Sequence, residues 1–345
     1  MTLSRHPHFR MKVLLDTTHP AAIFIAQFSA VRTLRRIFTM EMKNNSDSFD
    51  FLNGLRVLSL FWVIFGHTFV FNANFASNSI DALAWSQNIA FQLIVSGLFS
   101  VDTFFVLSGF LTAVLFIRQI TKEKLTFRLF ILYYIHRYIR LTPTFVLVIL
   151  VSINLTPYFG RGPLYPSKQG FEPDGCSHRG WWLSILYIGN LFKSDDICLS
   201  ASWYLHNDMQ FHWIAPLALI PFVIGRKSIA FIMATLFVLV GIGVPGLNRS
   251  ALIAYHTLSR PCWALCIGWL VFLCSTNQGG TVNTILSWPI WTPLARLNYS
   301  TYLIHVMIIF ITIYNQSTPI YVAAIVVVIF FETPFFILEK KLFKR

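Results

Sequence analysis

Long runs of apolar residues are the feature that most constrains how this chain can fold. A helix of about 20 apolar residues crosses the ~30 Å hydrocarbon core of a bilayer. About eight segments approach or exceed that length: residues 55–73, 91–117, 141–157, 203–224, 228–246, 258–275, 298–314 and 319–338. Because lipid cannot satisfy free backbone groups, each segment must be helical. The sequence therefore predicts an all-α protein, a polytopic membrane helix bundle with about eight transmembrane helices.

Composition supports a lipid-facing surface. Charged residues make up 12% of the chain, against about 25% in ordinary soluble domains. The net charge of +13 could suggest nucleic-acid binding, but the basic residues lie between apolar runs and not on one soluble face. We expect an integral, multi-pass protein of the endoplasmic reticulum or plasma membrane, with the lipid bilayer as a partner and no nucleic-acid partner.

The distribution of basic residues predicts the orientation of the bundle. Lys and Arg accumulate on cytoplasmic loops of membrane proteins. Here they gather before the first apolar segment, between the second and third, in the turn after the fourth, and at the chain end. Both termini are therefore expected in the cytoplasm. We divide the chain into a basic cytoplasmic arm, a transmembrane domain and a basic cytoplasmic tail, at residues 1–50, 51–340 and 341–345.

The same topology places residues 158–202 outside the cytoplasm. Cys176 and Cys198 both fall in this loop, and an oxidising compartment favours a disulfide between them. Two free thiols are the alternative. Asn248 begins an Asn-x-Ser/Thr tripeptide in another loop on that side and is our candidate glycosylation site.

Ionisable residues inside apolar segments mark candidate functional sites. Arg56 and His67 are 11 residues apart, which at 100° per residue leaves them about 20° from eclipsed on one helix face. His67 could act as a general base, or could be a structural histidine bonded to a backbone carbonyl on another helix. Asp102 in the second segment needs a partner, and Arg56 or His67 would provide one. A catalytic triad of Ser108, His67 and Asp102 is a further alternative.

Two other groups of polar residues flank apolar segments. Arg137 and Arg140 end the basic cytoplasmic loop before the third segment. Arginine suits bidentate phosphate recognition, although composition alone favours an orientation signal together with contact with anionic lipid headgroups. Asp208 and Gln210 lie just inside the predicted outer end of the fourth segment.

Several stretches, taken together and in order, resemble the acyltransferase-3 family of membrane proteins, in particular its nose-resistant-to-fluoxetine branch. These are FLNGLRVLSLFWVIFGH, SVDTFFVLSGFL, RYIRLTP, the SWYL and DMQF elements, RPCWALCIGWLVFLC, LARLNYSTYLIH and FFETPFFILEK. The resemblance runs from about residue 28 to the end. It departs from the family at Asn53, where many relatives have Asp, and between Phe211 and Arg260, where two further spans are expected. The chain therefore looks like a truncated member.

The resemblance implies transfer of an acyl group, typically from acyl-CoA, to a hydroxyl or amine acceptor. It aligns the family's histidine with His67, its arginine with Arg56, and its acidic-Gln element with Asp208 and Gln210. The family's arginine-rich loop aligns with Arg137 and Arg140, which would hold the CoA phosphates. We expect Arg56 and Asp102 to position His67, acyl-CoA to act as co-substrate, and no bound cofactor or metal. A transporter or lipid-handling protein could use the same polar cavity without acyl-transfer chemistry.

Overall fold

The computed structural model describes residues 29–40, 49–73, 89–122, 126–160, 165, 176, 180–191, 198–242 and 250–315. Within these residues the chain forms helices and no β-strand. The longer helices are α2 (Ala30–Phe38), α3 (Phe51–Ala73), α6 (Phe99–Lys122), α7 (Phe127–Asn154), α10 (Trp203–Val223), α11 (Lys227–Ile242), α12 (Ser250–Ser275) and α14 (Trp291–Asn315). Shorter ones are α5 (Ile89–Val95), α9 (Gly180–Ile185) and α13 (Gly280–Leu286), with 3-10 turns η2 (Ser96–Leu98), η3 (Thr156–Tyr158), η4 (Gly189–Leu191) and η6 (Ser200–Ser202).

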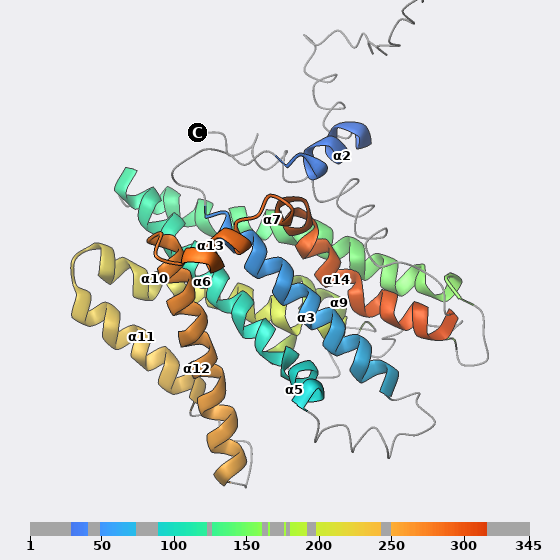
Figure 1. Cartoon of the computed structure of the whole chain (residues 1–345). Coiled ribbons are helices and arrows are strands. Elements are labelled where there is room, and N and C mark those ends of the chain that lie inside the picture. The colour runs from blue at the N-terminus through green and yellow to red at the C-terminus, as the bar shows by residue number, and fades with distance from the viewer. Residues whose placement is uncertain are drawn as a thin grey trace, which may run out of the picture.

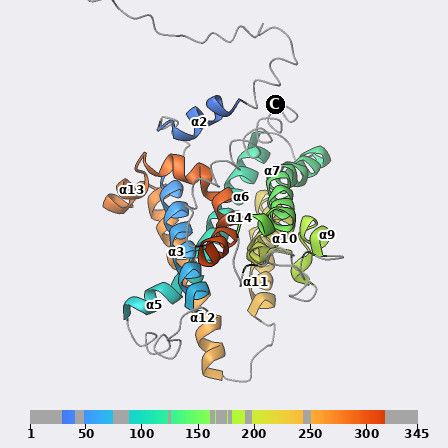
Figure 2. The same cartoon turned by 90° about the vertical axis from the view of Figure 1, so that its right-hand side faces the viewer.

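The helices form one bundle centred on α3 and α6. Helix α3 packs along α14 and α6, while α6 also contacts α10 and α12, and α10 packs against α11 (Figure 1). Helices α2 and α13 lie apart from one another but toward the same end of the bundle (Figure 2), which we call the α2 end. The predicted cytoplasmic side of the chain corresponds to this end, because α3 begins there.

Close packing at the α2 end explains one glycine of the first segment. The backbone of Gly54 on α3 lies directly against the backbone of Leu286 on α13, and a Cβ at residue 54 would collide with the Leu286 carbonyl oxygen. Only glycine lets the two backbones approach this closely. Gly54 in the first sequence motif therefore has a packing role.

The structure confirms an all-helical membrane architecture. Within the described ranges, four helical segments are long and apolar enough to cross a bilayer: Phe51–Asn72, Phe91–Thr121, Phe127–Asn154 and Trp291–Tyr314. Helices α10 and α11 match the fourth and fifth predicted segments to within four residues, whereas α12 begins at Ser250, eight residues before the sixth predicted segment. Residues 319–338 and 341–345 lie outside the described residues, as does Asn248. The total of eight spans and the cytoplasmic placement of both termini remain predictions.

The predicted start of the third apolar segment, at residue 141, was wrong. Helix α7 begins at Phe127, not near residue 141, and runs for 28 residues. Arg137 and Arg140 are consequently part of a membrane helix and not of a loop. A hydropathy pattern breaks at charged residues, whereas the folded chain continues the helix because a partner on another helix neutralises Arg137.

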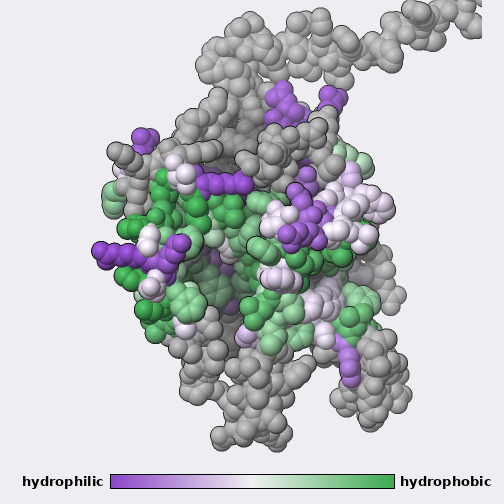
Figure 3. Space-filling view, turned by 60° about the vertical axis from the view of Figure 1, so that its left-hand side comes forward, coloured by the Kyte–Doolittle hydropathy of each residue, from purple (hydrophilic) through white to green (hydrophobic). Residues whose placement is uncertain are grey.

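Apolar side chains cover much of the described surface, as expected for contact with lipid. Figure 3 shows them over a large part of the face that it presents. Phe65, Leu115, Phe231 and Leu265 are each more than half exposed. Exposure of this kind on several helices is typical of a surface that meets hydrocarbon and not water.

A folded cap, formed among the described residues by Cys176, α9, η4 and Cys198, covers part of the bundle beside α10. The predicted disulfide is confirmed: Cys176 is bonded to Cys198 across 22 residues of sequence. Cys198 is fully buried and packs in one core cluster with Phe145 of α7 and with Tyr187. The Tyr187 hydroxyl lies 3.1 Å from the Thr142 hydroxyl, and burial raises the pKa of that phenol. The bridge therefore fixes the cap onto α7.

We predict that breaking this bridge destabilises the protein. In the chain-entropy model, closing a loop of about 20 residues contributes about 3 kcal/mol, so Cys198→Ser should lower the free energy of unfolding by about that amount. Cys262→Ser, at an exposed free cysteine, is the matched control and should change little. Alkylation of unreduced protein followed by mass spectrometry checks the bond itself. Full alkylation of both Cys176 and Cys198 would refute it.

Candidate functional site

Two histidines from different helices meet inside the bundle. The Nδ1 atom of His67 on α3 lies 2.8 Å from Nε2 of His305 on α14. Their rings are nearly parallel, with centroids 5.0 Å apart, and the ring of Phe71 lies beside His67. His305 is fully buried and His67 is partly buried. His67 thus faces the bundle, and its Nδ1 contacts another imidazole instead of a backbone carbonyl.

A second polar cluster joins three helices by a buried ion pair. Arg137 of α7 donates to the Asp208 carboxylate of α10, and their side chains are only 18% and 9% exposed. The same guanidinium donates to the Ser108 hydroxyl of α6 at 3.0 Å. It also lies within hydrogen-bonding distance of Thr112 and of the His212 ring. Asp208 and Arg137, both predicted from the sequence, are therefore brought together.

Arg137 and Ser108 are hydrogen-bonded partners in this cluster. A buried arginine is costly unless a counter-charge and further acceptors satisfy it, and here a carboxylate and a hydroxyl do so. Ser108 accepts a hydrogen bond from Arg137, so the triad with His67 is not formed. Both terminal nitrogens of Arg137 are engaged by protein groups, whereas its buried Nε atom has no hydrogen-bond partner.

The sequence suggested that Asp102 pairs with Arg56 or His67. The structure shows a different partner. Its carboxylate lies 4.0 Å from the Nε atom of Arg260 on α12. Asp102 stands in the first turn of α6, on a helix that packs against both α3 and α12. Rotation of α6 turns the carboxylate toward α12, and helical spacing within a single segment carries no information about that rotation.

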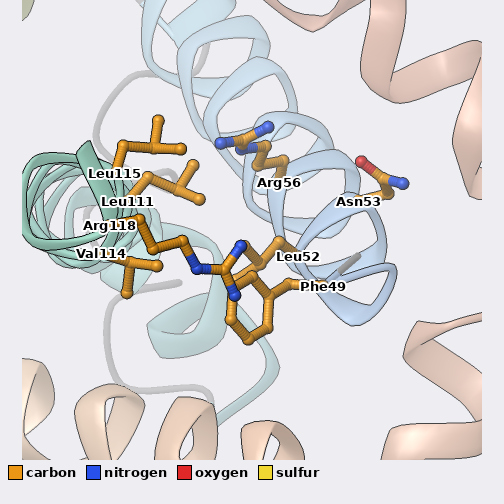
Figure 4. A pocket seen from close by; sticks show the side chains of 8 residues that line it. All are labelled: Phe49, Leu52, Asn53, Arg56, Leu111, Val114, Leu115 and Arg118. Atoms are coloured by element: carbon orange, nitrogen blue, oxygen red, sulfur yellow. The ribbon is translucent and has the colours of Figure 1, made fainter. Parts of the chain in front are cut away.

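A cavity of about 230 Å³ opens between α3 and α6 near the α2 end. Arg56 on α3 and Arg118 on α6 extend into the space between the two helices, and Asn53 also lines it (Figure 4). The Arg118 guanidinium lies over the Phe49 ring, 5.4 Å from its centroid. The remaining lining residues are apolar: Leu52, Leu111, Val114 and Leu115. Two guanidinium groups make the cavity suited to an anionic group.

Arg56 and His67 share one face of α3 but contact different neighbouring helices. Arg56 lines the cavity beside α6 and lies within electrostatic range of Arg140 and Tyr204, whereas His67 contacts α14. Eleven residues of helix place His67 about 16 Å farther along α3. Buried Leu60 and Val63 lie between them on α3. The cavity therefore does not reach His67 in this structure.

Gln210 anchors the cap. Its Nε2 atom donates to the Tyr187 carbonyl at 2.8 Å and to the Asn190 side-chain oxygen at 2.6 Å. Asn190 in turn donates to Asn207 of α10. Gln210 thus holds the cap to α10 and has a structural explanation independent of substrate.

Several residues of the site were not singled out from the sequence. His305 is an ionisable residue in an apolar segment, so the criterion that selected His67 could have found it. Arg118 was counted as an orientation signal, and Arg260 was read as part of a sequence motif. Among the described residues, no group of three His, Cys, Asp or Glu side chains could hold a metal ion.

We predict that the Arg137–Asp208 pair is required for stability. Arg137→Ala leaves a buried carboxylate without its counter-charge and should lower the free energy of unfolding by about 3–5 kcal/mol, measured by SDS titration of detergent-solubilised protein. Arg128→Ala, at an exposed position of the same helix, should change it by less than about 0.5 kcal/mol. The double variant Arg137→Met with Asp208→Leu should recover most of the loss. Equal stability of Arg137→Ala and Arg128→Ala would contradict this assignment.

Comparison with known proteins places this site in a family. The chain is 27% identical to nose resistant to fluoxetine protein 6 of Caenorhabditis elegans over 87% of its own length and 49% of the relative's. It is 24% identical to regulator of hypoxia-inducible factor 1 of the same organism over 60% of its length and 40% of the relative's. The chain therefore spans half or less of each of these relatives, and no solved structure matches it. An acyltransferase domain matches residues 49–249, more than half of the chain, and the protein belongs to the acyltransferase-3 family.

Proposed function

We propose that the protein is a membrane acyltransferase in which His67 is the general base. The observation that carries the proposal is the placement of His67. It lies within the matched acyltransferase domain, and its imidazole is held inside an apolar helix bundle by a second imidazole. Histidine is the side chain best suited to proton transfer near neutral pH.

The reaction follows from one proton transfer at this ring. His67 takes the proton from an acceptor hydroxyl or amine as the acceptor atom attacks the carbonyl carbon of an acyl thioester. The new ester or amide bond forms while the carbon–sulfur bond breaks. The imidazolium then returns the proton to the departing thiolate, so that the products are the acylated acceptor and a free thiol.

The cavity between α3 and α6 supports an anionic donor such as acyl-CoA. Arg56 and Arg118 provide cationic groups there, and Arg140 lies within electrostatic range of Arg56. A phosphate held at this point would leave about 16 Å along α3 to His67, a distance suited to the long pantetheine arm. The arm would have to displace the side chains of Leu60 and Val63. Phosphate binding in this scheme is assigned to Arg56 and Arg118 instead of Arg137.

Replacing the base should abolish most of the activity. His67→Ala is expected to lower kcat for thiol release from acetyl-CoA and palmitoyl-CoA by 10²–10⁴-fold, or about 3–5 kcal/mol of barrier. Purified protein in lipid nanodiscs would be assayed with a thiol reagent and with radiolabelled acyl chains in the presence of membrane lipid extract. His136→Ala, at an exposed histidine of α7, is the matched control and should retain full activity. Unchanged transfer by His67→Ala, or no transfer by the wild type above the variant, would overturn the proposed function.

The cavity can be tested separately from the base. Arg118→Ala should remove a charge-assisted contact of about 1.5–3 kcal/mol and so raise KM for acetyl-CoA by about 10- to 100-fold, with little change in kcat. The KM for an acetyl thioester of N-acetylcysteamine, which has no phosphate, should not change. Arg128→Ala serves as the charge-matched control. An equal rise in KM for both donors would show that Arg118 does not bind the phosphates.

A further inference from the structure

The hydrogen bonds of His305 determine where its proton lies. Its Nδ1 atom is hydrogen-bonded to the backbone carbonyl of Tyr302, one turn earlier in α14. A carbonyl oxygen can only accept, so Nδ1 of His305 must carry a hydrogen. Tyr302 is itself held in place, because its hydroxyl donates to the Ala201 carbonyl at 3.0 Å.

That assignment extends to His67. A neutral imidazole has one N–H group, so Nε2 of His305 presents a lone pair. The His67 Nδ1 atom, 2.8 Å away, must then be the donor. In neutral His67 the lone pair is left on Nε2, the nitrogen away from His305. This is the tautomer that a general base requires.

We propose that His305 is a positioning residue that selects the catalytic tautomer of His67, an inference that rests on the proposed function. The Tyr302 carbonyl orients His305, and His305 orients His67. When His67 accepts a proton on Nε2, its Nδ1–H continues to donate to His305, so the imidazolium keeps its acceptor. A buried Asp does the same for the histidine of a serine-protease triad. Here the acceptor is neutral, which avoids burying a negative charge.

Packing restrains the His67 and His305 rings in the orientations that this proposal requires. His305 is fully buried and stacks on His67, while Phe71 lies beside the His67 ring. Helices α3 and α14 pack along one another throughout this region. A ring flip of His305 would break both hydrogen bonds at once, and a flip of His67 would break the bond between the two rings. Either flip leaves a buried nitrogen unpaired.

The test compares two variants of similar size. His305→Gln can present its side-chain oxygen where Nε2 of the histidine stands, and so can accept from His67. His305→Leu fills similar volume but has no acceptor. Both are made in the full chain in lipid, with melting temperature as the folding control. The first readout is the protonation of each His67 ring nitrogen, by ¹⁵N solid-state NMR with the signals identified by their loss in His67→Ala.

We expect Nδ1 of His67 to be protonated and Nε2 unprotonated in the wild type and in His305→Gln. His305→Leu should shift the population toward the Nε2–H tautomer. In the acetyl-CoA assay, His305→Leu should lower kcat by tenfold or more with little change in KM, and its activity should persist to lower pH because the imidazolium has lost its acceptor. His305→Gln should recover most of the rate.

Two outcomes would overturn the inference: an Nε2–H tautomer of His67 in the wild type, or an unchanged tautomer and rate in His305→Leu. Failure of His305→Gln to restore either quantity, when it melts as the wild type does, would assign His305 to packing alone. Because the NMR readout needs no substrate, it decides the tautomer even if His67→Ala shows that the proposed acyl transfer is wrong. Failure of the inference and failure of the proposed function are therefore distinguishable.

Discussion

The ion pair between Arg137 and Asp208 determines how α6, α7 and α10 can associate. A guanidinium inside an apolar bundle is tolerated only where a counter-charge and additional acceptors surround it. Asp208 supplies the charge, and Ser108 and Thr112 supply hydroxyl acceptors. Because these groups come from three helices, the cost of leaving any one unpaired fixes their rotation and depth. Helix α7 runs for 28 residues and carries Arg137 within it, at the position where this pair forms.

The other arginines near the α2 end lie in a different environment from that of Arg137. Arg137 and Arg140 are one helical turn apart, yet Arg137 is enclosed by protein acceptors while Arg140 lies in electrostatic range of Arg56. Positive charge is thereby concentrated at the α2 end, around the cavity lined by Arg56 and Arg118. Like charges held close together favour binding of an anion, because an anion relieves their repulsion. The charge distribution thus separates a structural ion pair from a candidate ligand site.

The histidine pair has the geometry that the proposed acid-base chemistry requires in a low-dielectric interior. A carboxylate beside His67 would need its own counter-charge, as Asp208 does. His305 provides the His67 ring with a hydrogen-bond acceptor that has no formal charge. The Tyr302 carbonyl determines which nitrogen of His305 is that acceptor. In the proposed mechanism, the His67 ring remains neutral until it takes a proton from the acceptor. The contact between the two histidines depends on close packing of α3 against α14, which also holds the two rings parallel.

The amino-acid sequence by itself determined the helical membrane class, most helix positions, the Cys176–Cys198 bridge and the choice of His67 as a buried ionisable residue. These depend on local quantities, namely the length and polarity of a segment and the compartment of a loop. Tertiary structure alone decided that Asp102 meets Arg260, that Arg137 meets Asp208, and that His67 meets His305. Each pairing depends on the rotation and depth of two helices relative to one another. A single segment specifies which face is polar, but the partner of that face is chosen by the packing of the whole bundle.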